Sequence, residues 1–263
     1  PGPSFGLFQG WATNALFRGA ERFAGRMTDH FVTVADAMRD QYLAAGISQA
    51  DDYTRIPSGF DLQPFLDAEN SPTKRASLGL SPGDFVVGKI ARLFELKGHD
   101  DLFAIAPRLA RRIPNIRFLL VGDGVWRGRF ERLAKEIGCG QNFIFTGLVP
   151  PSEIPSLVGV MDALVHLSRR EGLPRALPQA MAAAKPVVAY DCDGAGEVCL
   201  DGKTGHLIEP GDLAKLEERL AKLTNDAPLR TALGQAGRKL VEEEFTVEQL
   251  VERQYELYKR LLA

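Results

Sequence analysis

Residues 169–190 read Arg-Arg-Glu-Gly-Leu-Pro-Arg-Ala-Leu-Pro-Gln-Ala-Met-Ala-Ala-Ala-Lys-Pro-Val-Val-Ala-Tyr, and this stretch decides the fold. It follows an apolar run at 163–167 and contains a Gly/Pro turn, a helix-forming segment that ends near Lys185, and a β-branched pair at 187–188. The pattern predicts a strand, a turn, a helix and a second strand. Open α/β sheets place ligands at turns that follow the carboxyl ends of strands, so we expect a binding site here.

Two polar side chains of this stretch, Glu171 and Gln179, are candidates for holding the two ends of one elongated ligand. They would lie roughly 12 Å apart if the whole segment were helical, with room for phosphate between them at the start of the helix. A carboxylate accepts hydrogen bonds from several hydroxyls, and an amide both donates and accepts. The alternative is that Glu171 only complements the helix dipole and Gln179 is a surface amide. Pro178 is expected in the first helical turn, where its missing N–H is not needed.

The rest of the chain alternates strands with helices, which predicts an α/β fold with a Rossmann-like, doubly wound parallel sheet and right-handed crossovers. Apolar runs predict strands at 31–34, 54–57, 85–90, 116–121, 143–146, 163–167, 187–190 and 205–208. Helices are expected at 8–28, 36–45, 100–112, 126–137, 152–160, 213–223, 228–243 and 247–262. A further helix follows the strand at 163–167 and ends at residue 184. Residues 62–82 read as a linker with one short helix at 73–78.

The composition excludes several classes of function. The net charge of −2 gives no general reason to bind nucleic acid. The three cysteines and four histidines lack metal-ligand spacing, and the thiols are expected to be reduced, as in a cytoplasmic protein. No apolar stretch reaches the length of a membrane span.

The first connection of the regular part carries two cations, Arg92 and Lys97, between the strand at 85–90 and the next helix. A guanidinium fork and an ammonium group near a helix start suit a diphosphate. The alternative is a solvated loop with two surface cations, and spacing alone does not separate the two interpretations. The loop lacks the Gly-x4-Gly-Lys-Ser/Thr pattern of a phosphate-binding Walker A loop.

Gly122 and Gly124 follow the next strand and allow a ligand to approach the backbone closely, or simply make a tight turn. Arg127 stands where Gly-x-Gly-x-x-Gly would have its third glycine, which disfavours a nicotinamide or flavin enzyme. In the Pro-rich loop after 143–146, backbone groups of Leu148 and Val149 can read a base edge.

Two further features carry expectations. Glu197 ends the Gly-rich connection after the strand at 187–190, and we expect it to open a helix near the same cleft. The helix at 8–28 is amphipathic and basic, so it either packs as a surface helix, which is favoured, or lies on an anionic membrane. Its apolar face would carry Phe8, Trp11, Ala15, Phe23 and Met27.

Taken together, these pieces resemble the retaining glycosyltransferase family 4 of the GT-B fold, also called glycosyl transferase group 1. The resemblance runs from about residue 30 to the end, and its strength lies in the order and spacing of individually weak motifs. They are Val87-Gly-Lys-Ile-Ala-Arg-Leu-Phe-Glu-Leu-Lys-Gly-His99, Leu120-Val-Gly-Asp-Gly124, Phe145-Thr-Gly-Leu-Val149, Glu171-Gly-Leu-Pro174 with Gln179-Ala-Met-Ala182, and Asp201-Gly-Lys-Thr-Gly-His-Leu-Ile-Glu-Pro-Gly-Asp212.

The resemblance implies two Rossmann-like domains that face a cleft. Residues 1–60 would be the last part of an N-terminal acceptor domain, and residues 61–245 a nucleotide-sugar donor-binding domain. Residues 246–263 would form a helix that crosses back and packs on residues 1–57. The chain starts without Met in what reads as mid-domain sequence, so we expect a fragment that binds donor poorly and transfers little.

By the family pattern, Arg92 and Lys97 would neutralise the leaving diphosphate, and Glu171 would contact the transferred sugar. The second acid of the family's Glu-x7-Glu motif is replaced by Gln179, which keeps hydrogen bonds to a ribose but loses their charge-assisted strength. No metal or other cofactor is implied. The residues expected to bind donor are Gly122, Gly124, Leu148, Val149, Gly172, Leu173, Pro174 and Gln179.

The implied activity is transfer of a hexose, with retention, from a UDP- or GDP-linked sugar to a hydroxyl of a glycan, a lipid-linked acceptor or a small molecule. The implied location is the cytoplasm, with peripheral contact to the inner membrane face, and the implied product a cell-envelope polysaccharide. Two alternatives stay open: a catalytically weakened nucleotide-sugar binding module, suggested by Gln179, and a GT-B-fold sugar-nucleotide epimerase.

Overall fold

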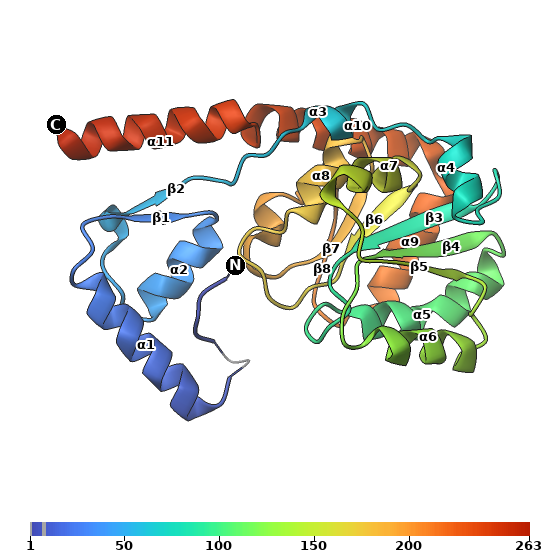
Figure 1. The fold of residues 1–263 in the computed structure, drawn as a ribbon, viewed down its shortest axis with the longest axis horizontal. Helices are drawn as coiled ribbons and strands as arrows, with labels where there is room; N and C mark the ends of the chain where they lie inside the picture. The colour runs from blue at the N-terminus through green and yellow to red at the C-terminus, as the bar shows by residue number, and fades with distance from the viewer. Residues whose placement is uncertain (1, 7–8) are drawn as a thin grey trace.

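A six-stranded parallel sheet forms the centre of residues 85–208 (Figure 1). The computed structural model describes residues 2–6 and 9–263. The strands lie in the order β5-β4-β3-β6-β7-β8, which is 3-2-1-4-5-6 when counted from β3 along the chain. Their bounds are β3 Phe85–Ile90, β4 Ile116–Val121, β5 Phe143–Gly147, β6 Ala163–His166, β7 Val187–Tyr190 and β8 Gly205–Ile208. The predicted doubly wound sheet is confirmed.

Helices cover both faces of this sheet, and each face has its own apolar core. In β4, Phe118 and Leu120 belong to one core, while Leu119 and Val121 belong to the other. Strands buried on both faces read as continuous apolar runs, which is why the sequence marks them clearly. One face packs against α5 His99–Arg112, α6 Arg127–Glu136 and α9 Leu213–Asn225. The other packs against α7 Ile154–Gly159 and α8 Ala176–Ala182, with α10 Ala227–Glu244 on α8.

The segment at 62–82 contains two helices where the sequence predicted one. α4 (Pro72–Ser77) begins at Ser71, whose hydroxyl accepts from the backbone N–H of Lys74 at 3.3 Å. The helix that was missed, α3 (Gln63–Leu66), has a proline in its first turn and buries Phe65. A proline in the first turn is compatible with a helix, but several prolines in one segment predict a linker, so this helix was not expected.

A small unit precedes the sheet and consists of β1 (Phe31–Thr33), α2 (Asp36–Ala44) and β2 (Tyr53–Arg55). The two strands are parallel, with Phe31 opposite Tyr53. We call residues 31–55 the βαβ unit. Before it, α1 spans Trp11–Gly25 and buries none of its residues. The expected packing of its apolar face is therefore wrong: Trp11 is 85% exposed and Phe23 66% exposed. Phe8, expected on the same face, lies outside the described residues.

The last helix, α11 (Val247–Leu262), leaves the sheet and runs back towards the βαβ unit (Figure 1). Arg260 Nη2 donates to Thr54 Oγ1 at 2.7 Å, so the helix reaches β2 as expected. The helix packs little against the rest of the protein, because Leu257 is its one buried residue among those that the structure describes. The domain boundaries at residues 60 and 245 stay a prediction. In residues 2–6 and 9–263, no helix is long and apolar enough to cross a membrane.

Candidate functional site

The strand order places a crevice between β3 and β6. Connections after β3 lead towards β4, whereas those after β6 lead towards β7, so the loops at the carboxyl ends of these two neighbours diverge. The strands are paired in register, with Val87 opposite Ala163 and Gly88 opposite Leu164. In open α/β sheets ligands bind at this topological switch point. The loop with Arg92 and Lys97 follows β3, and the loop with Glu171 follows β6.

Lys97 and Glu171 meet across this crevice. The ammonium nitrogen of Lys97 donates to Glu171 Oε1 at 2.6 Å and to Ser168 Oγ at 3.3 Å. Both side chains are largely buried, with 25% of Lys97 and 19% of Glu171 exposed. The structure therefore brings together two of the residues predicted from sequence, 74 positions apart in the chain.

His166, one of the four histidines without metal-ligand spacing, is a neighbour of Glu171 that the sequence did not single out. It ends β6, and its Nε2 lies 3.3 Å from the same Glu171 Oε1. Burial lowers the pKa of His166, against the influence of Glu171, so the ring is neutral near pH 7. Its position in the sequence could have indicated this contact, because His166 is the last residue of the strand that precedes the Glu171 loop.

Glu171 is ionised over the whole physiological range. Burial raises the pKa of its carboxyl group, but the hydrogen bonds and charges of His166 and Lys97 outweigh this and lower the pKa to about 2. Since His166 is itself neutral, we attribute the lasting stabilisation of the carboxylate to Lys97.

The loop before α5 is held in a fixed shape that presents Lys97. Leu96 and Gly98 on either side of it have φ angles of +65° and +63°. A Cβ atom at Gly98 would lie 2.0 Å from the carbonyl oxygen of Leu167, so glycine is needed where this loop touches the end of β6. The backbone N–H of Arg169 donates to the Leu96 carbonyl at 2.8 Å, which ties the two site loops together.

Arg92 lies on the same loop with an exposed guanidinium group. Its Cζ lies 4.8 Å from the centroid of the Phe94 ring, a cation–π distance. Within the described part of the chain the guanidinium group makes no hydrogen bond or ion pair, which leaves its donors available. The imidazole Nε2 of buried His99 lies 3.1 Å from the Arg92 carbonyl oxygen and holds the backbone there.

The glycines after β4 have a packing reason in this structure. A Cβ atom at Gly122 would lie 2.4 Å from the Ala91 carbonyl oxygen, and one at Gly124 would lie 2.3 Å from that of Leu93. These glycines thus let the loop after β4 lie directly against the loop that carries Arg92. Their expected contact with donor is a prediction.

The loop after β5 joins the same edge of the sheet, because the Gly122 N–H donates to the Gly147 carbonyl at 3.2 Å. Leu148 is 85% exposed, and Val149 packs against one of the apolar cores.

The remaining predicted residues lie on the segment after Glu171. The Gly172 carbonyl accepts from the Gly194 N–H at 3.1 Å, Leu173 packs on an apolar core, and Pro174 is buried. Pro178 is the third residue of α8, in the first turn as predicted. Gln179 is half-buried, and its side chain makes no hydrogen bond or ion pair with the described residues.

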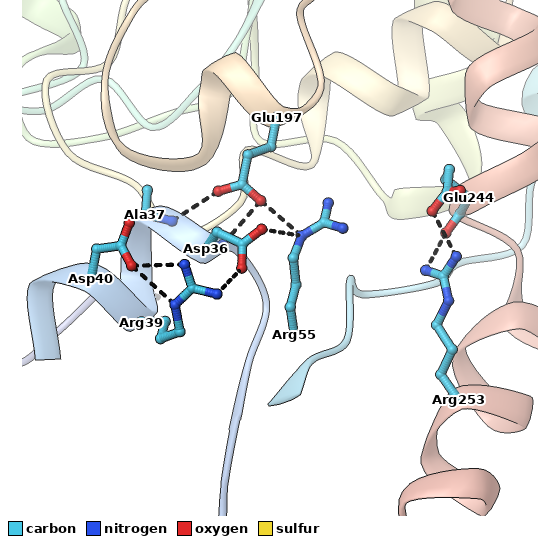
Figure 2. A network of polar contacts seen from close by, with 8 residues as sticks. All are labelled: Asp36, Ala37, Arg39, Asp40, Arg55, Glu197, Glu244 and Arg253. Atoms are coloured by element: carbon cyan, nitrogen blue, oxygen red, sulfur yellow. Dashed lines mark hydrogen bonds and ion pairs between the residues drawn. The ribbon is translucent and has the colours of Figure 1, made fainter. Parts of the chain in front are cut away.

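Glu197 corrects one expectation. It does not open a helix; it ends the short 3-10 turn η3 (Asp193–Glu197), whose glycines favour a tight turn. Its carboxylate accepts from the backbone N–H groups of Asp36 and Ala37 at 3.0 and 2.9 Å, and from Arg55 Nε at 2.8 Å (Figure 2). Glu197 therefore binds the start of α2 in the βαβ unit.

Lys89 is a second residue that sequence reasoning missed. It lies inside the apolar run of β3 and is 2% exposed. Burial and the charge of Lys97 lower its pKa to about 7, while Asp101 and Glu171 act in the opposite direction. A lysine within a buried strand was the signal in the sequence.

A cavity of about 640 Å³ lies beside the crevice. Its lining combines residues of the site loops with residues of the N-terminal segment, including Leu96, Arg169, Asp193, Phe5, Arg18 and Gln41. In residues 2–6 and 9–263, no group of three or more His, Cys, Asp and Glu side chains is placed to hold a metal ion.

Known proteins resemble this chain over most of its length. The family model for glycosyl transferases group 1 matches residues 70–240. A GDP-mannose-dependent alpha-(1-6)-phosphatidylinositol monomannoside mannosyltransferase of Mycolicibacterium smegmatis is 31% identical over 87% of this chain and 62% of its own length. The putative glycosyltransferase EpsD of Bacillus subtilis is 29% identical over 90% of this chain and 63% of its own length. The chain thus spans less than two thirds of either relative.

Solved structures agree with the fold. Anabaena Alr3699/HepE in complex with UDP superposes with a TM-score of 0.85 at 23% identity, over 97% of this chain and 70% of that one. The C-terminal domain of a glycosyl transferase group 1 protein from Francisella tularensis gives a TM-score of 0.65 at 26% identity, over 72% of this chain and all of that one. The fold is that of the GT-B glycosyltransferases. With the family model spanning most of the sheet and the motifs meeting at its switch point, this chain belongs to the glycosyl transferases group 1 family.

Proposed function

We propose that this chain is the nucleotide-sugar-binding part of a glycosyltransferase that transfers a hexose to an acceptor hydroxyl with retention of configuration. The observation that carries the proposal is the contact of Lys97 with Glu171 at the switch point of the sheet, beside the open guanidinium of Arg92. A sugar nucleotide needs both kinds of group, because its diphosphate is anionic and its sugar carries hydroxyls.

In this proposal Arg92 and Lys97 bind the diphosphate and stabilise the charge that grows on it as its bond to the anomeric carbon breaks. Glu171 accepts hydrogen bonds from the sugar hydroxyls, with the backbone of Gly172 and Leu173 beside it. The acceptor hydroxyl attacks from the face that the diphosphate leaves, which gives retention. The anomeric configuration of the product, read by NMR, tests this step: an inverted product contradicts it.

The base and ribose would extend along the other loops of the same sheet edge. Gly122 and Gly124 line the path from Arg92, backbone groups of Leu148 and Val149 meet the base, and Pro174 and Gln179 meet the ribose. The side-chain amide of Gln179 has no partner among residues 2–6 and 9–263, and this supports its assignment, since both its donor and its acceptor are open there. The relatives' names support a GDP- or UDP-linked donor.

The acceptor is proposed to enter through the 640 Å³ cavity, whose lining includes Leu96 and Arg170, the sequence neighbours of Lys97 and Glu171, together with Phe5 and Arg18. A glycan, a lipid-linked sugar or a small polyol fits this description. Cations at the diphosphate supply the charge that a metal ion would otherwise supply, so we propose that no metal cofactor takes part.

A thermal-shift panel of nucleoside diphosphates and their sugars tests the proposal. A ligand at 100 times its Kd adds about 2.7 kcal/mol to the free energy of unfolding. We expect stabilisation by UDP, GDP or one of their sugars, and the same shift in the presence of a chelator. No shift with any member of the panel contradicts a nucleotide-sugar site, and a shift abolished by the chelator contradicts metal independence.

Peripheral membrane contact is proposed through α1, which exposes Trp11 and Phe23 and carries Arg18 and Arg22. Arg26 and the exposed Met27 follow directly after the helix. An amphipathic basic helix binds anionic lipid surfaces. Trp11 fluorescence in a Trp126→Phe chain should shift to the blue with vesicles of anionic lipid. An unchanged spectrum with anionic vesicles contradicts this contact.

A further inference from the structure

One carboxylate connects the βαβ unit to the loop that carries Glu171. Asp193 Oδ2 accepts from the backbone N–H of Glu171 at 2.6 Å. Its other oxygen, Oδ1, accepts from Gln41 Nε2 at 2.6 Å. Gln41 lies on α2, 152 positions before Asp193. The position of the Glu171 backbone is thereby linked to a helix outside the sheet.

The backbone at Asp193 is constrained in a way that supports a specific role. Its φ angle is +51°, in the left-handed region that residues with a side chain seldom occupy. Such a conformation persists only where the surroundings enforce it, and it is often associated with function.

The next residue is also enclosed. The Gly194 N–H donates to the Gly172 carbonyl at 3.1 Å. A Cβ atom at Gly194 would lie 2.4 Å from that carbonyl oxygen and 2.7 Å from Ala35 Cβ. The start of η3 is therefore packed between the Glu171 loop on one side and the βαβ unit on the other.

The other end of η3 is fixed on the same helix. Glu197 binds the N–H groups of Asp36 and Ala37 at the start of α2, where a carboxylate also complements the helix dipole (Figure 2). Arg55 of β2 completes the contact. Both ends of η3 are thus attached to α2, so movement of α2 relative to the sheet is transmitted to the residues that hold Glu171.

We infer that Asp193 and Gln41 are positioning residues for Glu171, and that the βαβ unit sets the place of this carboxylate through η3. The consequence for catalysis rests on the proposed function, in which Glu171 binds the sugar. A displacement of about 1 Å at a reacting group can cost a hundredfold in rate, so holding the backbone of Glu171 matters to sugar binding and transfer.

Three substitutions and one control distinguish a loss of Glu171 positioning from a general loss of protein stability. Asp193→Gly keeps the left-handed backbone and removes both accepted hydrogen bonds, whereas Asp193→Asn tolerates the backbone and leaves one accepting oxygen. Gln41→Leu removes the donor on α2. Asp40→Ala is the control, because Asp40 also lies on α2 but its exposed carboxylate pairs with Arg39 of its own helix.

Hydrogen–deuterium exchange with mass spectrometry tests the contact itself. Peptides that cover residues 168–175 should exchange about tenfold faster in Asp193→Gly and Gln41→Leu than in the wild type, with an intermediate effect for Asp193→Asn. Peptides of β4 report global unfolding and should not change. Unaltered exchange at 168–175 in the first two variants, or an equal increase in Asp40→Ala, overturns the inference.

A comparison of two affinities tests whether the contact positions Glu171 for sugar binding. The affinity for a diphosphate is compared with that for its sugar nucleotide, in the pairs UDP and UDP-glucose, and GDP and GDP-mannose. Because Glu171 is placed at the sugar, Gln41→Leu should weaken binding of the sugar nucleotide about tenfold and leave that of the diphosphate within twofold. Equal loss of both ligands contradicts positioning of Glu171. Absence of any nucleotide binding by the wild type contradicts the proposed function and the catalytic role with it, while the exchange experiment still decides whether the contact holds the loop.

Discussion

Lys97 and Glu171 neutralise each other before any ligand arrives, and this shapes how both can act. The 2.6 Å hydrogen bond keeps Glu171 ionised despite its burial. It also holds the Lys97 ammonium at the crevice, where the proposed diphosphate would bind. Binding of an anion to such a site would cost little free energy for rearranging the side chains, because the charged groups are already held in position.

Glu171→Gln should lower the free energy of unfolding by roughly 1.5–3 kcal/mol at pH 7, the range for a hydrogen bond to a charged group. The folded-state pKa of Glu171, about 2, lies below its ordinary value of 4.5. The stabilisation is therefore complete above about pH 4.5 and is lost as the pH falls towards 2. Urea unfolding of both proteins between pH 7 and pH 3 should show their difference shrinking below pH 4.5.

The matched control is Glu243→Gln, which removes an exposed carboxylate 3.9 Å from Lys239 on α10. It should change the free energy of unfolding by less than about 0.5 kcal/mol. A Glu171→Gln effect no larger than that of the control would mean that the Lys97–Glu171 pair is not a stabilising contact.

At this scale the sequence could indicate Arg92, Lys97 and Glu171, because each follows a strand whose apolar run is easy to recognise. His166 beside Glu171 could also have been indicated, because it ends the strand that leads into the Glu171 loop. Gln41 beside Asp193 could not, because no local pattern encodes a pairing over 152 positions. Gln179 could be named as a candidate, and its contact with a ribose stays a prediction.

Among the elements, the start of α5 is the one whose geometry the site depends on most. Gly98 is its N-cap residue, with a left-handed backbone pressed against the end of β6. This contact fixes how far the Lys97 loop stands from the Glu171 loop.

Gly98→Ala should destabilise the protein by more than the roughly 1–2 kcal/mol that a left-handed backbone costs an alanine. The added Cβ would lie 2.0 Å from the Leu167 carbonyl oxygen, so the loop must also move. Gly79→Ala is the control, since Gly79 has a φ of +70° with open space around it. Urea unfolding curves compare the two, and equal losses would show that the close approach at Gly98 carries no cost.

The strands of the sheet were the easiest elements to predict. β3, β4, β7 and β8 have the predicted bounds, because buried parallel strands are apolar on both faces and end at turn residues. α3 was missed because four residues with a proline carry no helical period. Glu197 was misassigned because a Gly-rich turn after a strand can lead into a helix or a 3-10 turn, and its partner on α2 is distant in sequence.

In the whole molecule, the sheet and the βαβ unit are two bodies joined by two crossings of the chain. The crossings lie side by side, since the Phe60 N–H donates to the Phe245 carbonyl at 3.1 Å. The two apolar cores of the sheet lie within residues 62–245, and a third small core lies near α2. Each body thus has its own core.

Residues 61–245 alone should therefore fold and unfold cooperatively in urea, with the far-UV circular dichroism of an α/β protein. The isolated C-terminal domain of the Francisella tularensis protein, which this chain resembles over 72% of its length, supports this expectation. A broad, non-cooperative transition would contradict the proposed boundaries at residues 60 and 245.

Lys97 is proposed to bind the diphosphate of a sugar nucleotide at the β3–β6 crevice. Isothermal titration calorimetry of UDP and GDP into the wild type, Lys97→Ala and Lys135→Ala tests it most directly, because Lys135 is an exposed lysine of α6 away from the crevice. Loss of a charge-assisted hydrogen bond worth about 1.5–3 kcal/mol predicts binding roughly 10 to 100 times weaker in Lys97→Ala. Lys135→Ala should bind as the wild type does. Equal affinity of Lys97→Ala and the wild type for the nucleotide that binds would contradict the account.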